Sequence, residues 1–300
     1  MRRLVLIFSL IILFFLKAAA QHSDSNKNHL QLLTLQDSLK ELSFKMVNES
    51  IEPERYNAGY QFIKTLVNAL KTPYSFNFPF DSLKAISIQS SPDKRFRIFS
   101  WHVMNDDGSY RYYGTIQINN PQGKLEMFPL VDYTPSFKNA SDSATTNERW
   151  YGAQYYRIIS VLNNVKNPYY VLLGWKGNTV RSTKRVIEIL YFKEGKAFFG
   201  MPVFDGDKDN PGSKRVIFEY DRKASMVLNY EPSISTIVFD HLAPPDPKLK
   251  GRFNLYGPDF SYDGYRLVNG RWRFVQDLEL KNQPSDQDDN FNDPRKLKGN

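Results

Sequence analysis

Apolar residues recur with a period close to 3.6 residues in two segments near the N-terminus. The first segment is His29–Val47, and Asn28 before it is a suitable N-cap. Its apolar positions are Leu30, Leu33, Leu35, Leu39, Leu42 and Met46. The second segment, Glu52–Leu70, has Pro53 in its first turn and ends before Pro73. The pattern predicts a helical hairpin that is too small to fold without a larger body to pack on.

After Asp81 the apolar period changes from about 3.6 to 2, and β-branched and aromatic residues gather in short runs. The expected strands are Lys84–Gln89, Phe96–Met104, Tyr110–Ile118, Lys124–Val131, Tyr155–Leu162, Tyr169–Trp175, Arg185–Phe192, Lys196–Val203, Arg215–Tyr220, Ser225–Asn229, Ser233–His241, Tyr262–Val268 and Trp272–Leu278. Tight turns such as Glu194-Gly195 and Asn269-Gly270 join many of them, because Gly and Asn accept positive φ. No helix-length segment separates the strands, so the pattern predicts an antiparallel meander.

The fold class is therefore mainly β (α+β): a large twisted sheet, a sandwich or a propeller-like body, with an N-terminal helical hairpin. Two stretches, Lys84–Asp132 and Tyr155–Phe204, read as similar four-strand units, and a third begins near Lys214. The number of strands is low for a closed propeller, which favours the sheet or sandwich. A polar loop, 133–148, divides the β region. The expected divisions are a leader at 1–20, the hairpin at 21–80, the β domain at 81–280 and a disordered tail at 281–300.

The first twenty residues have the three parts of a secretory signal. Two arginines precede an apolar run from Leu4 to Leu16, and Ala18 and Ala20 occupy the small-residue positions that a signal peptidase reads. The run is short for a membrane span, which needs about twenty residues. We therefore expect export to the periplasm, the outer membrane or the medium, without a transmembrane segment in the mature chain.

Composition narrows the chemistry that this chain can perform. It has no cysteine and only four histidines, which excludes disulfides, thiolate nucleophiles and Cys-based zinc sites. Removing the leader lowers the formal charge from +8 to +5. This mild positive charge on an exported protein indicates no nucleic-acid partner. Serine-nucleophile and phosphate-binding motifs are also missing.

Several phrases resemble an uncharacterised family of exported proteins of Gram-negative bacteria. They begin at Ser91 (SPDKRFRI), Tyr170 (YVLLGW), Ile237 (IVFDHLAPP) and Tyr256 (YGPDFSYDGY), and they are spread over most of the β region. The resemblance implies an envelope or secreted location. It implies no activity and no catalytic residue.

Three carboxylates alternate in the segment that contains Asp205, Asp207 and Asp209. Such spacing can converge on calcium through oxygen ligands. However, Asn210 stands where an EF-hand has glycine, and Val216 stands where it has its last acid. A solvated turn is the favoured interpretation, calcium is the weaker one, and no other cofactor is expected.

A second group of acids surrounds the end of a predicted strand. Asp240 and His241 precede a Pro-Pro break, and Asp259 and Asp263 follow in a Gly-containing run. Carboxylates near a histidine suit general acid/base chemistry. Side chains alternate along a strand, so Asp240 and His241 should point to opposite faces. The competing interpretation is that these acids accept hydrogen bonds from turn backbone.

Among the aromatic residues, Trp175 and Tyr262 are the candidates for stacking on a ligand. The sequence thus favours a non-enzymatic envelope or secreted module that binds a glycan, a peptide or an envelope protein. The alternative is a carboxylate-dependent hydrolase acting on a polysaccharide.

Processing provides the first test. Because Ala18 and Ala20 occupy the positions read by the peptidase, we expect the mature protein to begin at Gln21. N-terminal mass spectrometry of the natively produced protein measures this directly. Retention of Met1 or Arg2 in that protein contradicts the assignment.

Overall fold

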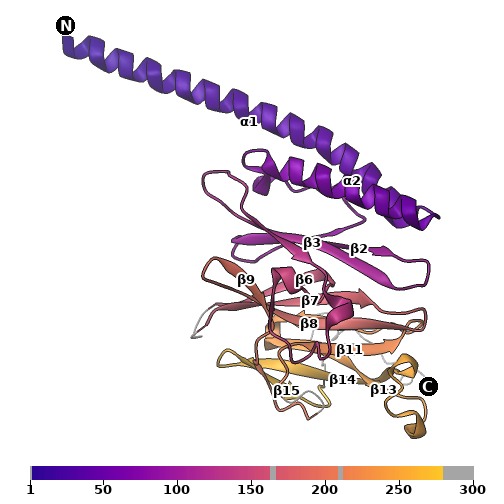
Figure 1. The fold of residues 1–300 in the computed structure, drawn as a ribbon. Helices are drawn as coiled ribbons and strands as arrows, with labels where there is room; N and C mark the ends of the chain where they lie inside the picture. The colour runs from indigo at the N-terminus through magenta and orange to yellow at the C-terminus, as the bar shows by residue number, and fades with distance from the viewer. Residues whose placement is uncertain (1, 163–166, 209–211, 280–300) are drawn as a thin grey trace, which may run out of the picture.

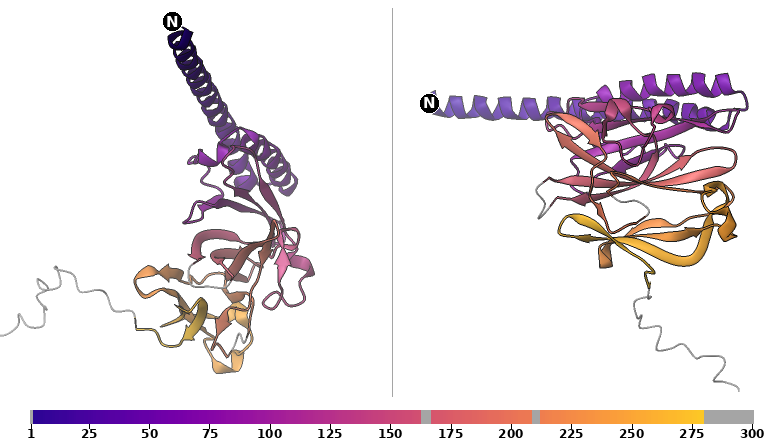
Figure 2. Two further views of the ribbon diagram at one scale, coloured as in Figure 1. Left: turned by 90° about the vertical axis from the view of Figure 1, so that its left-hand side faces the viewer. Right: turned by 60° about the horizontal axis from the view of Figure 1, so that its bottom comes forward.

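In a computed structural model, the described residues are 2–162, 167–208, 212–279. Strands hold 41% of the residues and helices 25%, so the protein is mainly β, as predicted. Two helices, α1 (Arg2–Asn48) and α2 (Glu52–Lys71), form the expected hairpin. The N-terminal part of α1 extends beyond the body of the protein (Figure 1; Figure 2). Within the described ranges, no helix is both long and apolar enough to cross a membrane.

The described strands form three sheets. Sheet I has the order β1-β2-β3-β4 and is antiparallel throughout. Its strands are β1 (Ser87–Ser90), β2 (Phe96–Met104), β3 (Tyr110–Ile118) and β4 (Met127–Val131). Sheet II has the order β5-β9-β8-β7-β6, and β11 also pairs with β8. Its strands are β5 (Thr145–Thr146), β6 (Gln154–Val161), β7 (Tyr169–Gly177), β8 (Ser182–Lys193), β9 (Lys196–Phe199) and β11 (Val216–Asp221).

Sheet III has the order β10-β15-β14-β13-β12, with β10 parallel to β15 and the other pairs antiparallel. Its strands are β10 (Phe204–Asp205), β12 (Leu228–Glu231), β13 (Thr236–Ala243), β14 (Gly257–Val268) and β15 (Arg271–Val275). Short 3₁₀ helices are η1 (Ser75–Asn77), η2 (Thr134–Ser136), η3 (Asn147–Arg149), η4 (Pro232–Ile234), η5 (Pro247–Leu249) and η6 (Phe253–Leu255). The three predicted units correspond to the three sheets with three exceptions. Strand β5, in the predicted loop, and β11, in the third unit, join sheet II, and β10, at the end of the second unit, joins sheet III.

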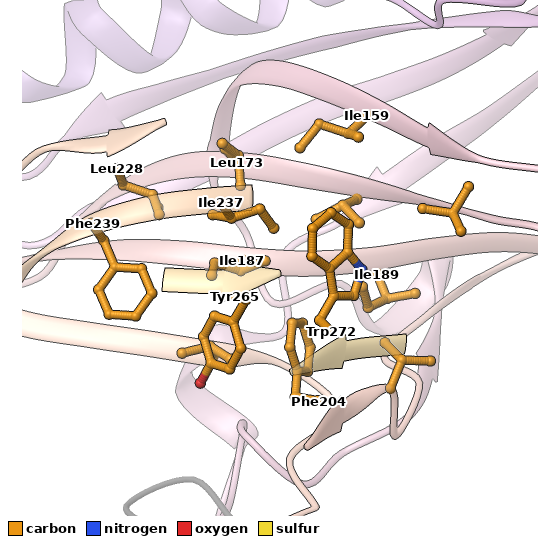
Figure 3. Packing of buried hydrophobic residues seen from close by; sticks show 14 of the residues in the cluster. Ile159, Leu173, Ile187, Ile189, Phe204, Leu228, Ile237, Phe239, Tyr265 and Trp272 are labelled. Atoms are coloured by element: carbon orange, nitrogen blue, oxygen red, sulfur yellow. The ribbon is translucent and has the colours of Figure 1, made fainter. Parts of the chain in front are cut away.

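The helical hairpin and the three sheets are stacked in a row instead of closing around an axis (Figure 1). Three apolar cores separate the four layers. The first joins the helices to sheet I, where the rings of Phe62 and Trp101 lie 5.1 Å apart. The second joins sheets I and II, where the rings of Phe96 and Tyr170 lie 4.7 Å apart. The third, between sheets II and III, contains Trp272 (Figure 3).

This stacking buries both faces of β2 and β7. In β2, Phe96 and Ile98 enter the second core, whereas Phe99 and Trp101 enter the first. Burial on both sides explains why apolar and aromatic residues occupy both faces of these strands.

The structure corrects several predicted boundaries. The predicted loop 133–148 contains η2 and strand β5, and it is tied to sheet II because the carbonyl of Ser141 accepts hydrogen bonds from the backbone of Lys214 and Arg215. Strand β14 begins at Gly257, five residues before the predicted start. The early part of β14 pairs with β13 beyond a bulge, so Asp259 lies in a strand instead of a loop. The predicted disordered tail falls outside the described residues.

One ion pair lies inside the middle sheet. The Arg215 Nε is 2.5 Å from Glu188 Oε2, and both side chains are fully buried. A second guanidinium nitrogen of Arg215 donates to the carbonyl of Ala140. Burial raises the pKa of Glu188, although the charge of Arg215 opposes the rise. The pair therefore joins β8 to the start of β11 and to the loop 133–148, which connects sheets I and II and is called the crossing loop below.

Replacing one partner should leave a buried charge unpaired. We expect Arg215→Met to lower the free energy of unfolding by about 3–5 kcal/mol. The double variant Arg215→Met/Glu188→Leu should recover most of this loss, because it removes both charges. Urea unfolding measures both values.

The control is Lys193→Met, which breaks the exposed Lys193–Glu194 pair (3.5 Å). Its expected cost is below about 1 kcal/mol, because exposed ion pairs contribute little. A cost for Arg215→Met no greater than that of this control contradicts the structural role of the buried pair.

Candidate functional site

The predicted His-Asp group assembles around a β-bulge in sheet III. The pairing register between β13 and β14 shifts between Asp240 and Leu242, so that His241 lies in the bulge. Its Nδ1 is 2.8 Å from an oxygen of Asp263, whose side chain is only 4% exposed. Its Nε2 is 3.9 Å from an oxygen of Asp259, which is 39% exposed. The structure thus brings three of the four predicted residues together.

All the acids of this group accept hydrogen bonds from backbone N–H groups. Asp240 is buried and accepts a hydrogen bond from the backbone N–H of Val227 at 2.7 Å, so its carboxylate is separate from the His241 group. Asp263 accepts from Asp277 at 3.0 Å through its second oxygen. Asp259 accepts from the backbone of Ser261 at 3.1 Å and from its hydroxyl at 2.7 Å. Each carboxylate therefore fixes a strand end or a turn, which is the role expected of turn acids.

The electrostatics of His241 agree with this arrangement. Partial burial lowers its pKa, but the hydrogen bond with Asp263 and the charges of Asp263, Asp259 and Asp277 outweigh burial, so the pKa is raised. The imidazole lies between two carboxylates: Nδ1 faces Asp263, and Nε2 faces Asp259. Among the described residues, no three His or acidic side chains are arranged to hold a metal ion.

The acidic loop before residue 209 is already engaged by protein donors. Both oxygens of Asp205 accept hydrogen bonds from the guanidinium of Arg271, each at 2.6 Å. Asp207 is buried and accepts from the hydroxyl of Tyr265. Asp209 lies outside the described residues. Asp205 and Asp207, the two described residues of the weak calcium prediction, thus accept hydrogen bonds from different protein groups.

Trp175, the other predicted ligand residue, lies near the end of β7 where two cavities meet. The larger cavity, of about 540 Å³, is lined by Trp175 and Gln154 together with Tyr156 and residues of the 79–89 segment. The smaller cavity, of about 290 Å³, is lined by Trp175, Tyr110 and Arg185 among others. Trp175 is only partly buried between them. Among the predicted site residues that the structure describes, it alone lines both of these cavities.

Neighbouring rings hold Trp175 in place. Tyr110 contacts it edge-on at 5.5 Å and His102 at 5.1 Å between ring centres. Burial lowers the pKa of His102 to about 4, against a hydrogen bond with Gln154, so this imidazole is neutral at pH 7. Gly177 leaves room for Tyr110, because a Cβ at that position would lie 2.3 Å from the ring. Trp175, Tyr110 and His102 therefore form a packed and uncharged aromatic wall.

Tyr262 is not part of this wall. It is partly buried in β14 opposite Asp240, and it lines neither cavity. A third cavity, of about 680 Å³, lies between the β7 and β15 ends and contains none of the predicted site residues. Of the two aromatic candidates, only Trp175 therefore lines a cavity among those described.

Sequence reasoning missed two arginines of the smaller cavity, Arg185 and Arg222. Arg185 is opposite Trp175 in the pairing of β7 with β8, and its guanidinium carbon is 5.3 Å from the ring centre of Tyr156. Alternation of aromatic and basic residues along neighbouring strands was the only available signal, and cross-strand packing produces the same pattern.

Lys176 is a second omission, next to Trp175 but directed elsewhere. Its ammonium group donates to Thr134 Oγ1 (2.9 Å) and to the carbonyls of Tyr151 (2.8 Å) and Gly152 (2.6 Å). Burial lowers its pKa to about 7. These contacts attach the start of the crossing loop and the segment after it to sheet II, which gives Lys176 a structural role.

Comparison of the chain with protein families, with curated proteins and with solved structures finds no match. The resemblance to exported proteins of Gram-negative bacteria stays an expectation.

The His241 group predicts a pH effect on stability. Because the pKa of His241 is raised in the folded protein, protonation stabilises the fold at pH values below about 6.5, and this contribution is lost as the pH rises through the raised value. We expect His241→Asn to lower the free energy of unfolding by about 0.5–1 kcal/mol more at pH 5.5 than at pH 8.5. Urea unfolding at both pH values measures the difference.

The matched variant is Asp263→Asn, which keeps the side-chain shape and removes the partner charge. In the Asp263→Asn protein, the loss of unfolding free energy caused by His241→Asn should differ less between pH 5.5 and pH 8.5. An effect of His241→Asn that does not change with pH contradicts the assignment.

Proposed function

We propose that the protein is an exported binding module and that its ligand, a glycan, peptide or envelope protein, lies along Trp175. The observation that carries the proposal is the position of Trp175, partly buried at the junction of two cavities of about 540 and 290 Å³. Ligand sites combine such concave aromatic surfaces with a few polar groups that fix orientation.

The lining of the larger cavity supports this proposal. Phe80, Ile86 and Ile88 supply apolar surface, while Gln89 and Gln154 supply amide groups. An amide both donates and accepts hydrogen bonds, and an aromatic ring packs against the apolar face of a sugar or a peptide side chain. The charged residues of the cavity, Asp81 and Lys84, are of opposite sign. Shape and neutral polar groups therefore dominate recognition there.

Export is supported by the sequence. The leader features of residues 1–20 and the cysteine-free chain are compatible with an exported protein, and the resemblance to exported Gram-negative proteins points the same way. Location in the periplasm, at the outer membrane or in the medium belongs to the same proposal.

The alternative is a polysaccharide hydrolase that uses the His241 group, and the 2.8 Å contact between His241 and Asp263 is the observation in its favour. A glycosidase needs two carboxylates that face a bound sugar. Here Asp240 and Asp263 are buried and accept backbone hydrogen bonds, and neither they nor Asp259 line any of the three cavities. The binding module is the better supported of the two.

The test is binding of the wild-type protein and Trp175→Ala to arrays of bacterial and plant polysaccharides and of peptides. We expect Trp175→Ala to weaken binding at least tenfold, because truncating a central aromatic anchor removes most of its contact area. The control is Phe253→Ala, which truncates an aromatic residue that is 50% exposed and lines none of the three cavities.

Unchanged binding by Trp175→Ala contradicts the proposal. Release of sugar by the wild-type protein that is lost in Asp259→Asn and Asp263→Asn supports the hydrolase instead.

A further inference from the structure

The smaller cavity beside Trp175 has two cationic side chains and no acidic one in its lining. Arg185 and Arg222 line it together with five residues that carry hydroxyl groups, namely Tyr110, Ser182, Thr183, Tyr220 and Ser225. Neither arginine forms an ion pair with a described acidic residue. The cavity therefore has an excess of positive charge.

Arg185 is held by aromatic rings and not by a carboxylate. Its guanidinium lies over Tyr156, and its charge acts on the hydroxyl groups of Tyr156 and Tyr220. Its Nε is buried without a hydrogen-bond partner. Ring faces and tyrosine hydroxyl groups carry no full negative charge, so they hold this cation without neutralising it.

Arg222 lies at the exposed side of the same cavity and is fixed by neutral acceptors. Its Nη1 donates to the carbonyl of Thr179 at 3.1 Å, and its Nη2 donates to the hydroxyl of Tyr110 at 2.8 Å. Both contacts orient the guanidinium without neutralising it.

Three acidic residues on strands β11 and β13, Glu219, Asp221 and Asp240, already accept hydrogen bonds from other groups. Glu219 pairs with Lys184 at 3.2 Å and accepts hydrogen bonds from Ser182 and Asn178. Asp221 accepts from the backbone of Lys223 at 2.8 Å, and Asp240 accepts from the backbone of Val227. The positive charge of the two arginines is therefore available for an anion that comes from outside the protein.

We propose that this cavity binds the carboxylate of an acidic sugar, a uronate, whose ring lies beside Trp175. The inference rests on the proposed function and specifies its ligand. A volume of about 290 Å³ accommodates one sugar ring, and a guanidinium can bind a carboxylate through two parallel hydrogen bonds. The lining has hydroxyl groups but no Leu, Ile or Val side chain, which suits a hydroxylated ring better than a peptide side chain. The neighbouring sugars of the same polysaccharide then lie in the larger cavity.

The experiment is calorimetric titration of the full-length protein with oligosaccharides of glucuronate, galacturonate and mannuronate. Each is compared with the same oligosaccharide after its carboxyl groups have been reduced to alcohols, which keeps the ring and removes the charge. We expect at least one acidic oligosaccharide to bind at least tenfold more tightly than its reduced form, and this difference to fall as sodium chloride is added.

Two variants locate the charge. Arg185→Gln and Arg222→Gln should each weaken binding of the acidic oligosaccharide at least tenfold, and each should weaken binding of the reduced form much less. The control is Arg181→Gln, which makes the same charge change on an exposed residue of the neighbouring turn that does not line the cavity. Thermal unfolding of each variant checks the fold. Arg222 is exposed, so its replacement keeps the test valid even if Arg185→Gln unfolds.

Equal binding of acidic and reduced oligosaccharides that is lost in Trp175→Ala overturns the uronate proposal and keeps the binding module. Binding of peptides with a free C-terminal carboxylate, but not of amidated peptides or uronates, also overturns it and assigns the arginines to a peptide. Failure of every acidic and neutral glycan to bind overturns the uronate proposal, and failure of the peptides as well overturns both.

Discussion

The burial of sheet II on both faces is the constraint on which the rest of the structure depends. A sheet between two apolar cores leaves little solvent-exposed surface for polar side chains on its inner strands, so the buried ones are stabilised by partners inside the protein. Glu188 meets Arg215, and Lys176 meets two backbone carbonyls and a hydroxyl. These contacts reach the crossing loop between sheets I and II, so the same polar groups that the middle sheet must satisfy also attach its neighbours.

Local features of the fold follow from the sequence, whereas contacts between its layers do not. Period 3.6 before residue 72 and period 2 after residue 81 predict the hairpin and most strands, because each pattern depends only on neighbouring residues. The start of β14 was missed because Pro258 and Gly257 disfavour a strand, and pairing with Leu242 and Ala243 beyond the bulge overrides that preference. The Glu188–Arg215 pair joins two strands whose adjacency no local pattern reveals.

The same distinction between local features and contacts between layers applies to the candidate sites. Alternation along β13 predicts that Asp240 and His241 separate, and the structure places them so. The sequence also selects Trp175 as an aromatic candidate, but its significance comes from cavities built by sheet I, sheet II and the segment after β11. Arg185 and Arg222 meet there only because β11 pairs with β8 instead of joining sheet III. Spacing along the chain carries no information about that choice.

The row of layers also makes local stability unequal along the molecule. The helical hairpin and sheet III each contact one core, whereas sheets I and II each contact two. Either end can open by exposing a single core, but an inner sheet cannot open without exposing two. Slow hydrogen exchange should therefore concentrate in β2, β7 and β8, with faster exchange in the outer layers. The smaller cavity beside Trp175 is lined largely by β7, β8 and β11 of sheet II, so the proposed uronate would be held by an inner layer of the molecule.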